Sequence, residues 1–141
     1  MTIILNEKPP NYEEIKKHFP FNERDTIFCY GDKIYNPAGI QIAQAFIEHE
    51  ETHMRQQRDI GGPEIWWNRY FVEPDFRLTQ ELEAYGRQYW FFCTKNHDRN
   101  DRVRYLWQLS SIMRSPMYKV GNISHNDVVR AITRWAITHE K

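Results

Sequence analysis

The sequence predicts an α+β fold that is mainly helical, with one small antiparallel β-hairpin placed before a long, motif-bearing helix. Three observations predict it. Several segments have a helical period of apolar residues, the turn signal Gly31-Asp32 separates two β-prone runs, and prolines and glycines punctuate the chain between elements. The chain has 141 residues and no internal repeat or linker-like run, so we expect a single domain over residues 1–141.

Composition excludes some classes of protein. The chain has 19 Lys and Arg residues against 19 Asp and Glu residues, so its formal net charge is zero and no basic stripe suggests a nucleic-acid or membrane partner. No apolar run is long enough to cross a bilayer, and the N-terminal residues do not resemble a signal peptide. We therefore expect a cytoplasmic location, with Cys29 and Cys93 reduced.

The first elements are a short helix and a hairpin. Asn11 can cap a helix over "YEEIKKHF", which Pro20 ends. The runs Thr26–Tyr30 and Lys33–Tyr35 flank the two-residue turn signal and predict the hairpin strands. The second of these strands is a candidate edge for pairing with an extended peptide, the alternative being a simple structural cap.

Helices are predicted for the rest of the chain. Asn36-Pro37 supplies an N-cap and a first helical proline for a helix that ends at Asp59, before the "GGP" of residues 61–63. Later helices are expected within residues 63–73, over 78–92, over 102–114 and, after a Ser124 cap, over 125–139. Their core is expected to be built from four tryptophans: Trp66, Trp90, Trp107 and Trp135.

The helix over residues 37–59 carries His49-Glu50-Glu51-Thr52-His53. Residues four apart lie on the same helix face, so His49 and His53 can point at one metal ion. Glu50 faces nearly the same direction and can reach a metal-bound water without ligating the metal, which is where a general base is needed. This spacing indicates a metal centre, with Glu50 as the candidate catalytic residue.

A catalytic zinc usually has three protein ligands and one open position, so a third ligand must come from elsewhere in the chain. The segment "QELEAYGRQYW" offers Glu81 and Glu83. Two residues apart on a helix they project about 200° from one another, so only one of them can face the metal. Periodicity alone does not separate these two glutamates.

The motif, the hairpin before it and the glutamate on a downstream helix resemble the zincin metallopeptidases, specifically the gluzincins, which hold zinc with two histidines and a glutamate. In that branch a small residue commonly follows the ligand glutamate, as Ala84 follows Glu83 here. The resemblance therefore implies a Zn²⁺ cofactor held by His49, His53 and Glu83. It also implies peptide or protein substrates.

The stretch of about residues 25–125 is also similar to small, uncharacterised phage-type proteins with a minimal zincin core. That resemblance implies a place in the host cytoplasm or association with a virion. We therefore expect a zinc-dependent hydrolase, specifically a small metallopeptidase. The alternatives are a zincin-fold structural or virion-associated protein that binds zinc without peptidase activity, which the charged Glu51 and the small size favour, and a helical adaptor without a metal. The sequence does not indicate an oligomeric state.

Overall fold

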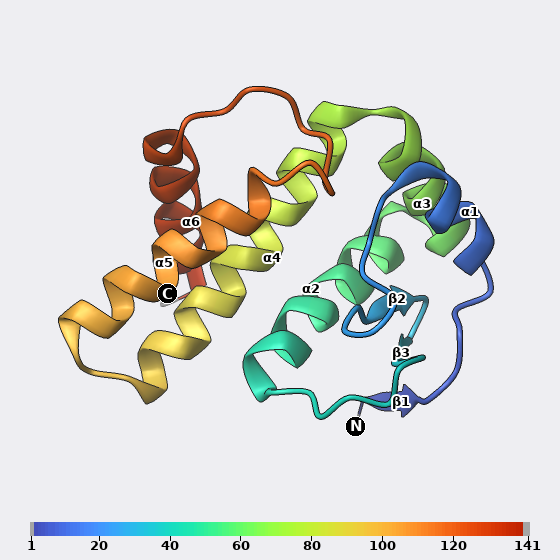
Figure 1. Ribbon diagram of the computed structural model, residues 1–141, viewed down its shortest axis with the longest axis horizontal. Coiled ribbons are helices and arrows are strands. Elements are labelled where there is room, and N and C mark those ends of the chain that lie inside the picture. Colours follow the sequence, from blue (N-terminus) through green and yellow to red (C-terminus); the bar gives the residue numbers. More distant parts are fainter. Residues whose placement is uncertain (1, 140–141) are drawn as a thin grey trace.

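The computed structural model describes residues 2–139. Two long helices, α2 (Gln44–Ile60) and α4 (Pro74–Lys95), run side by side through the middle of the molecule (Figure 1). The sheet, α1 (Tyr12–His18) and α3 (Pro63–Val72) lie on the α2 side. The helices α5 (Arg99–Met113) and α6 (His125–His139) pack on the other side of α4. The expectation of a mainly helical α+β fold is confirmed.

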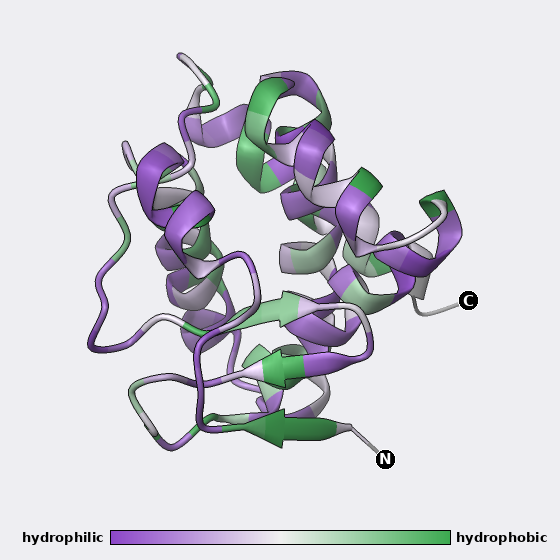
Figure 2. Ribbon diagram, turned by 90° about the vertical axis from the view of Figure 1, so that its right-hand side faces the viewer, coloured by the Kyte–Doolittle hydropathy of each residue, from purple (hydrophilic) through white to green (hydrophobic). Residues whose placement is uncertain are grey.

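The predicted hairpin is present, formed by β2 (Phe28–Tyr30) and β3 (Lys33–Tyr35) in antiparallel register. A third strand, β1 (Ile3–Leu5), was not predicted and pairs in parallel with β3. The sheet order is β1-β3-β2, and Figure 2 shows β2 nearest the helices. Because β3 is paired on both sides, its interpretation as a peptide-binding edge strand is wrong.

Helix α2 begins later than expected, at Gln44 rather than at Pro37. The side chain of Asn36 folds the chain into a loop instead, donating to the Ile40 carbonyl at 2.7 Å and accepting from the Ile40 N–H at 3.2 Å. This local hydrogen bonding competes with helix formation. The C-terminal end was predicted well: α2 stops at Ile60, and Gly61 follows in the left-handed region with φ of 112°.

The helices after α3 also have different bounds from those expected. Helix α4 begins at Pro74 and α5 at Arg99, each several residues earlier than the apolar period indicated. Ser124 caps α6 as predicted, because its Oγ accepts from the Asp127 N–H at 3.1 Å. No helix in the described part of the chain is long and apolar enough to cross a membrane.

The core has two parts. The aromatic cluster joins α1, the hairpin and α3 through Tyr12, Ile15, Phe19, Phe28, Tyr35, Trp66, Trp67 and Tyr70. The helical cluster joins α4, α5 and α6 through Tyr85, Leu106, Leu109, Met113, Val128 and Ile132. The predicted tryptophan core is wrong, because Trp66 is buried but Trp107 is 41% exposed.

Candidate metal centre

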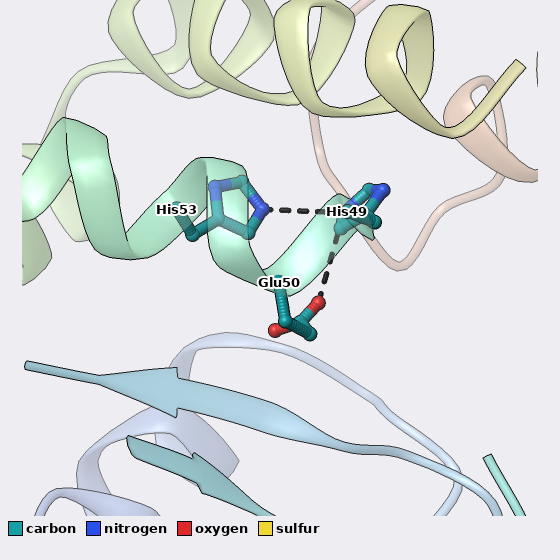
Figure 3. A group of neighbouring side chains, drawn as sticks. All are labelled: His49, Glu50 and His53. Atoms are coloured by element: carbon teal, nitrogen blue, oxygen red, sulfur yellow. Dashed lines mark hydrogen bonds and ion pairs between the residues drawn. The ribbon is translucent and has the colours of Figure 1, made fainter. Parts of the chain in front are cut away.

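His49 and His53 lie on the face of α2 that packs against α4, and both side chains are buried. Their Nε2 atoms are 3.2 Å apart. Figure 3 shows the His53 ring turned toward His49, with α4 passing along this side of the helix. The sequence prediction that the motif spacing brings these two rings together is met.

The carboxylate that reaches both histidines is Glu81 on α4. Its Oε1 lies 3.1 Å from His49 Nε2 and 3.2 Å from His53 Nε2. With the 3.2 Å between the two nitrogens, the three atoms form a nearly equilateral triangle. Ligands about 2.0–2.1 Å from a tetrahedral zinc are separated by about 3.3–3.4 Å, so this donor set fits such an ion.

Glu83, expected to be the third ligand, lies elsewhere. Its Oε2 contacts Arg55 Nη2, and its Oε1 accepts from Gln56 Nε2 at 2.9 Å. The two glutamates project in different directions from α4, so Glu81 faces the histidines and Glu83 faces the next turn of α2. The structure therefore makes Glu81 the candidate ligand in place of Glu83.

Glu50 is buried beside the triangle. Its carboxylate points toward the sheet (Figure 3), and its Oε2 lies 3.8 Å from His49 Nε2. One ligand atom from each of His49, Glu50 and His53 falls within a 4.8 Å span, so these residues together could hold a metal. Glu81 lies closer to both imidazoles than Glu50 does.

Each donor is held by a second hydrogen bond. His53 Nδ1 lies 2.8 Å from Gln56 Oε1, and His49 Nδ1 lies 2.9 Å from Gln88 Oε1. The other Glu81 oxygen, Oε2, accepts from the Tyr70 hydroxyl at 2.5 Å. Metal-bound imidazoles normally donate their second N–H to such a partner. Sequence reasoning missed Gln56, Gln88 and Tyr70, although the position of Gln56 one turn after His53 was a usable signal.

Burial and pairing shift the pKa values of this group. Burial raises the pKa of the Glu50 carboxyl, and the nearby histidines only partly oppose this. Burial disfavours the charge on His53, but the adjacent Glu81 carboxylate outweighs it and raises the pKa of His53 to about 9. Burial likewise disfavours the charge on Glu81, but His53 and His49 hold its pKa well below the usual range. Without a metal, a His53–Glu81 ion pair occupies the site.

A pocket of about 90 Å³ adjoins the triangle. His49, Glu50, His53 and Glu81 line one part of it. Most of the remaining wall is apolar or aromatic and comes from α1, β2, α3 and the loop after α5, and includes Phe19, Phe28, Trp66, Trp67, Met117 and Tyr118. The site is thus joined to a small, largely apolar pocket.

Arg77 holds the loop that carries Tyr118 against the rest of the site. This buried side chain donates to the carbonyls of Tyr118 at 2.6 Å and Lys119 at 2.8 Å. It also donates to the Tyr70 carbonyl at 2.5 Å. A single guanidinium therefore ties α4 to α3 and to the pocket-lining loop.

The sheet edge beside α2 is partly covered. The Cys29 carbonyl accepts from Gln57 Nε2 and from Trp67 Nε1, each at 3.1 Å, and the Gly31 N–H donates to Gln57 Oε1 at 2.7 Å. Gln57 therefore holds the hairpin against α2. Because the Cys29 carbonyl is already engaged, an added peptide strand cannot pair with β2 at that position. Within the described residues, neither Cys29 nor Cys93 takes part in a disulfide.

Tyr85 and Glu51 have clear positions in the structure. Tyr85 is buried and packs edge to face on His49 with ring centroids 4.5 Å apart. Its hydroxyl lies 2.5 Å from that of Tyr118, which lines the pocket. Glu51 accepts a hydrogen bond from the Thr2 hydroxyl and so is directed to the N-terminal segment.

Comparisons of the chain with protein-family models, with curated proteins and with solved structures found no match.

Proposed function

We propose that this protein is a small zinc-dependent hydrolase of the metallopeptidase type, with a minimal zincin-like arrangement of hairpin, motif helix and ligand helix. The observation that carries the proposal is the triangle of His49 Nε2, His53 Nε2 and Glu81 Oε1, whose sides are 3.1–3.2 Å. Hydrogen bonds in such a cluster need a donor on each line, whereas a cation can satisfy three converging lone pairs at once.

In this proposal His49, His53 and Glu81 hold the zinc. A zinc ion bound there would supply a Lewis acid that lowers the pKa of a bound water to about 7. Glu50, whose raised pKa suits proton exchange, accepts the proton of the attacking water and later delivers it to the leaving amine. The Tyr70 hydroxyl keeps the second Glu81 oxygen engaged and the carboxylate oriented.

The pocket suggests the kind of substrate. Its walls beyond the metal-binding group are mostly aromatic and apolar, and its volume is about 90 Å³. We therefore propose an amide or peptide bond flanked by a compact, uncharged apolar group. The covered carbonyl of Cys29 favours a short or flexible substrate segment over a long extended strand.

Zinc stoichiometry is the first test. Elemental analysis of the purified protein should find one zinc per chain, and His53→Ala and Glu81→Ala should lose it. Glu83→Ala distinguishes the two glutamates of α4, since it removes a carboxylate that does not touch the histidines; under saturating zinc it should still bind about one zinc per chain. A wild-type protein that takes up no zinc after reconstitution would overturn the proposal.

Activity is the second test. The zinc-loaded protein should cleave members of a peptide library that carry compact apolar residues next to the scissile bond. Glu50→Gln should abolish turnover while retaining zinc, because it removes the proton acceptor and leaves the three ligands intact. A zinc-loaded wild type that cleaves neither the library nor casein would instead identify a zinc-binding protein without peptidase activity.

A further inference from the structure

The side-chain amide of Gln56 has its orientation fixed by its neighbours. Its Nε2 lies 3.0 Å from the Gln80 carbonyl oxygen and 2.9 Å from Glu83 Oε1. A carbonyl and a carboxylate can only accept hydrogen bonds, so the atom between them must be the amide nitrogen. The amide oxygen is therefore the atom that faces His53.

That orientation determines which nitrogen of His53 carries hydrogen. Gln56 Oε1 lies 2.8 Å from His53 Nδ1 and can only accept, so Nδ1 must be the donor. A neutral imidazole has a single N–H, which leaves the Nε2 lone pair free. In the neutral form that metal binding requires, this lone pair points to the triangle with His49 Nε2 and Glu81 Oε1.

Glu83 is held in place on its other side. Its Oε2 contacts Arg55 Nη2, and its side chain is only 15% exposed. The contacts therefore run from Arg55 to Glu83, to Gln56 and to His53, with donors and acceptors alternating along the way. Removing Glu83 would leave one Gln56 N–H without its acceptor and make rotation of the amide easier.

We propose that Glu83 is a positioning residue for the metal centre, which acts through Gln56 to keep His53 in the tautomer that binds metal. The inference rests on the proposed function. It gives a role to the glutamate that the ligand set does not use, and it explains why two glutamates two residues apart on α4 both face α2.

The corresponding arrangement at His49 is less constrained. Gln88 Oε1 lies 2.9 Å from His49 Nδ1, and Gln88 Nε2 donates to the Tyr105 hydroxyl at 2.7 Å. A hydroxyl both donates and accepts, so this partner would tolerate either orientation of the Gln88 amide. The tautomer of His53 therefore has the stronger structural control of the two.

The chain offers a matched control. Glu48 on α2 pairs with Arg87 on α4 at 2.8 Å, and its side chain is 12% exposed, close to the value for Glu83. Both carboxylates thus form a partly buried ion pair between the same two helices. The Glu48 carboxylate contacts Arg87 and Gln44, and within the described residues neither of these hydrogen-bonds an imidazole ring, so removal of Glu48 tests the loss of an interhelical ion pair alone.

The experiment measures zinc affinity by competition with a chromogenic chelator. Gln56→Met should weaken zinc binding by about ten- to a hundredfold, the usual effect of losing an outer partner of a metal-bound histidine. For Glu83→Ala we expect a loss of zinc affinity at the low end of that range. Glu83→Gln should recover most of the affinity, since its amide oxygen can accept from Gln56. Glu48→Ala should match the wild type within about twofold.

A spectroscopic measurement separates positioning from general stability. In the zinc-loaded protein, long-range ¹H–¹⁵N spectra should show a slowly exchanging Nδ1–H on His53 that exchanges faster in Gln56→Met and Glu83→Ala and is unchanged in Glu48→Ala. If the wild type, Gln56→Met, Glu83→Ala and Glu48→Ala had equal zinc affinities and equal exchange rates of this N–H, the positioning role would be overturned while the zinc site would stand. Absence of zinc binding by the wild type would overturn the proposed function and this role together.

Discussion

The two faces of α4 are built from different chemistry. Toward α2 it presents Glu81 and Gln88, which are 4% and 0% exposed and hydrogen-bond the histidines. Toward α6 it presents Gly86, where an added Cβ would lie 2.3 Å from the Cβ of Trp135. Close apolar packing stabilises a fold directly, whereas buried polar groups cost free energy unless they are fully paired. We therefore expect one face of α4 to contribute mainly to stability and the other, under the proposed function, to metal binding.

Truncating an apolar side chain in the helical cluster that packs on α4 should have the largest effect on stability. Ile132 on α6 is fully buried in the helical cluster, and Ile132→Ala should lower the free energy of unfolding by about 2–5 kcal/mol. Urea unfolding with and without zinc measures this change in the free energy of unfolding. The loss should be the same in both conditions, because the donor atoms are hydrogen-bonded by Gln56, Gln88 and Tyr70 and not by Ile132. A loss confined to the zinc-loaded protein would break the division between the two faces.

Zinc should stabilise the protein through the polar face alone. At free zinc about a thousandfold above Kd, binding to the native state adds about 4 kcal/mol, and a chelator should remove this increment. Glu81→Ala should show no zinc-dependent shift in the thermal midpoint, whereas Ile132→Ala should keep the full shift on a lower baseline. A chelator-sensitive midpoint in Glu81→Ala would show that zinc binds elsewhere.

The metal-free protein should respond to pH through His53. Its folded pKa of about 9 lies above its ordinary value of about 6.5, so its pairing with Glu81 contributes stability that is complete below about pH 6.5 and lost as pH rises toward 9. Zinc must displace the same proton, so apparent zinc affinity should increase over that interval. Unfolding and zinc titrations from pH 6 to 9 test both trends.

His53→Ala is the control for the pH response. In that variant the metal-free stability should lose its decline between about pH 6.5 and 9, because the titrating group is gone. A metal-free wild type whose stability rises over this interval would contradict the ion pair with Glu81.

Much of the fold followed from local signals. The hairpin, the end of α2 at its glycines and the Ser124 cap depend on residues adjacent in sequence, and the structure agrees with them. The third strand did not follow, because the pairing of β1 with β3 joins segments about 30 residues apart that share no turn signal. The start of α2 was missed because the Asn36 side chain competes with the helix for backbone groups.

The candidate site was likewise predictable only in part. His49, Glu50 and His53 were predictable, since their spacing on one helix fixes their relative directions. The choice between Glu81 and Glu83 depends on the rotation of α4 against α2, which no local pattern encodes. The structure resolves it through distances: Glu81 is 3.1 Å from a histidine nitrogen, and Glu83 contacts Gln56 and Arg55.

The smallest expected effect is at Glu51, the charged middle residue of the motif. Its carboxylate accepts a hydrogen bond from Thr2 and so is directed to the N-terminal segment, not to the pocket. Glu51→Ala should therefore change the free energy of unfolding by no more than about 1 kcal/mol, the usual range for a partly exposed interaction, and leave zinc affinity unaltered. Chelator competition and urea unfolding compare the zinc affinity and the free energy of unfolding of this variant with those of Glu50→Gln. A large loss of zinc from Glu51→Ala alone would mean that the charge of Glu51 acts on the metal centre.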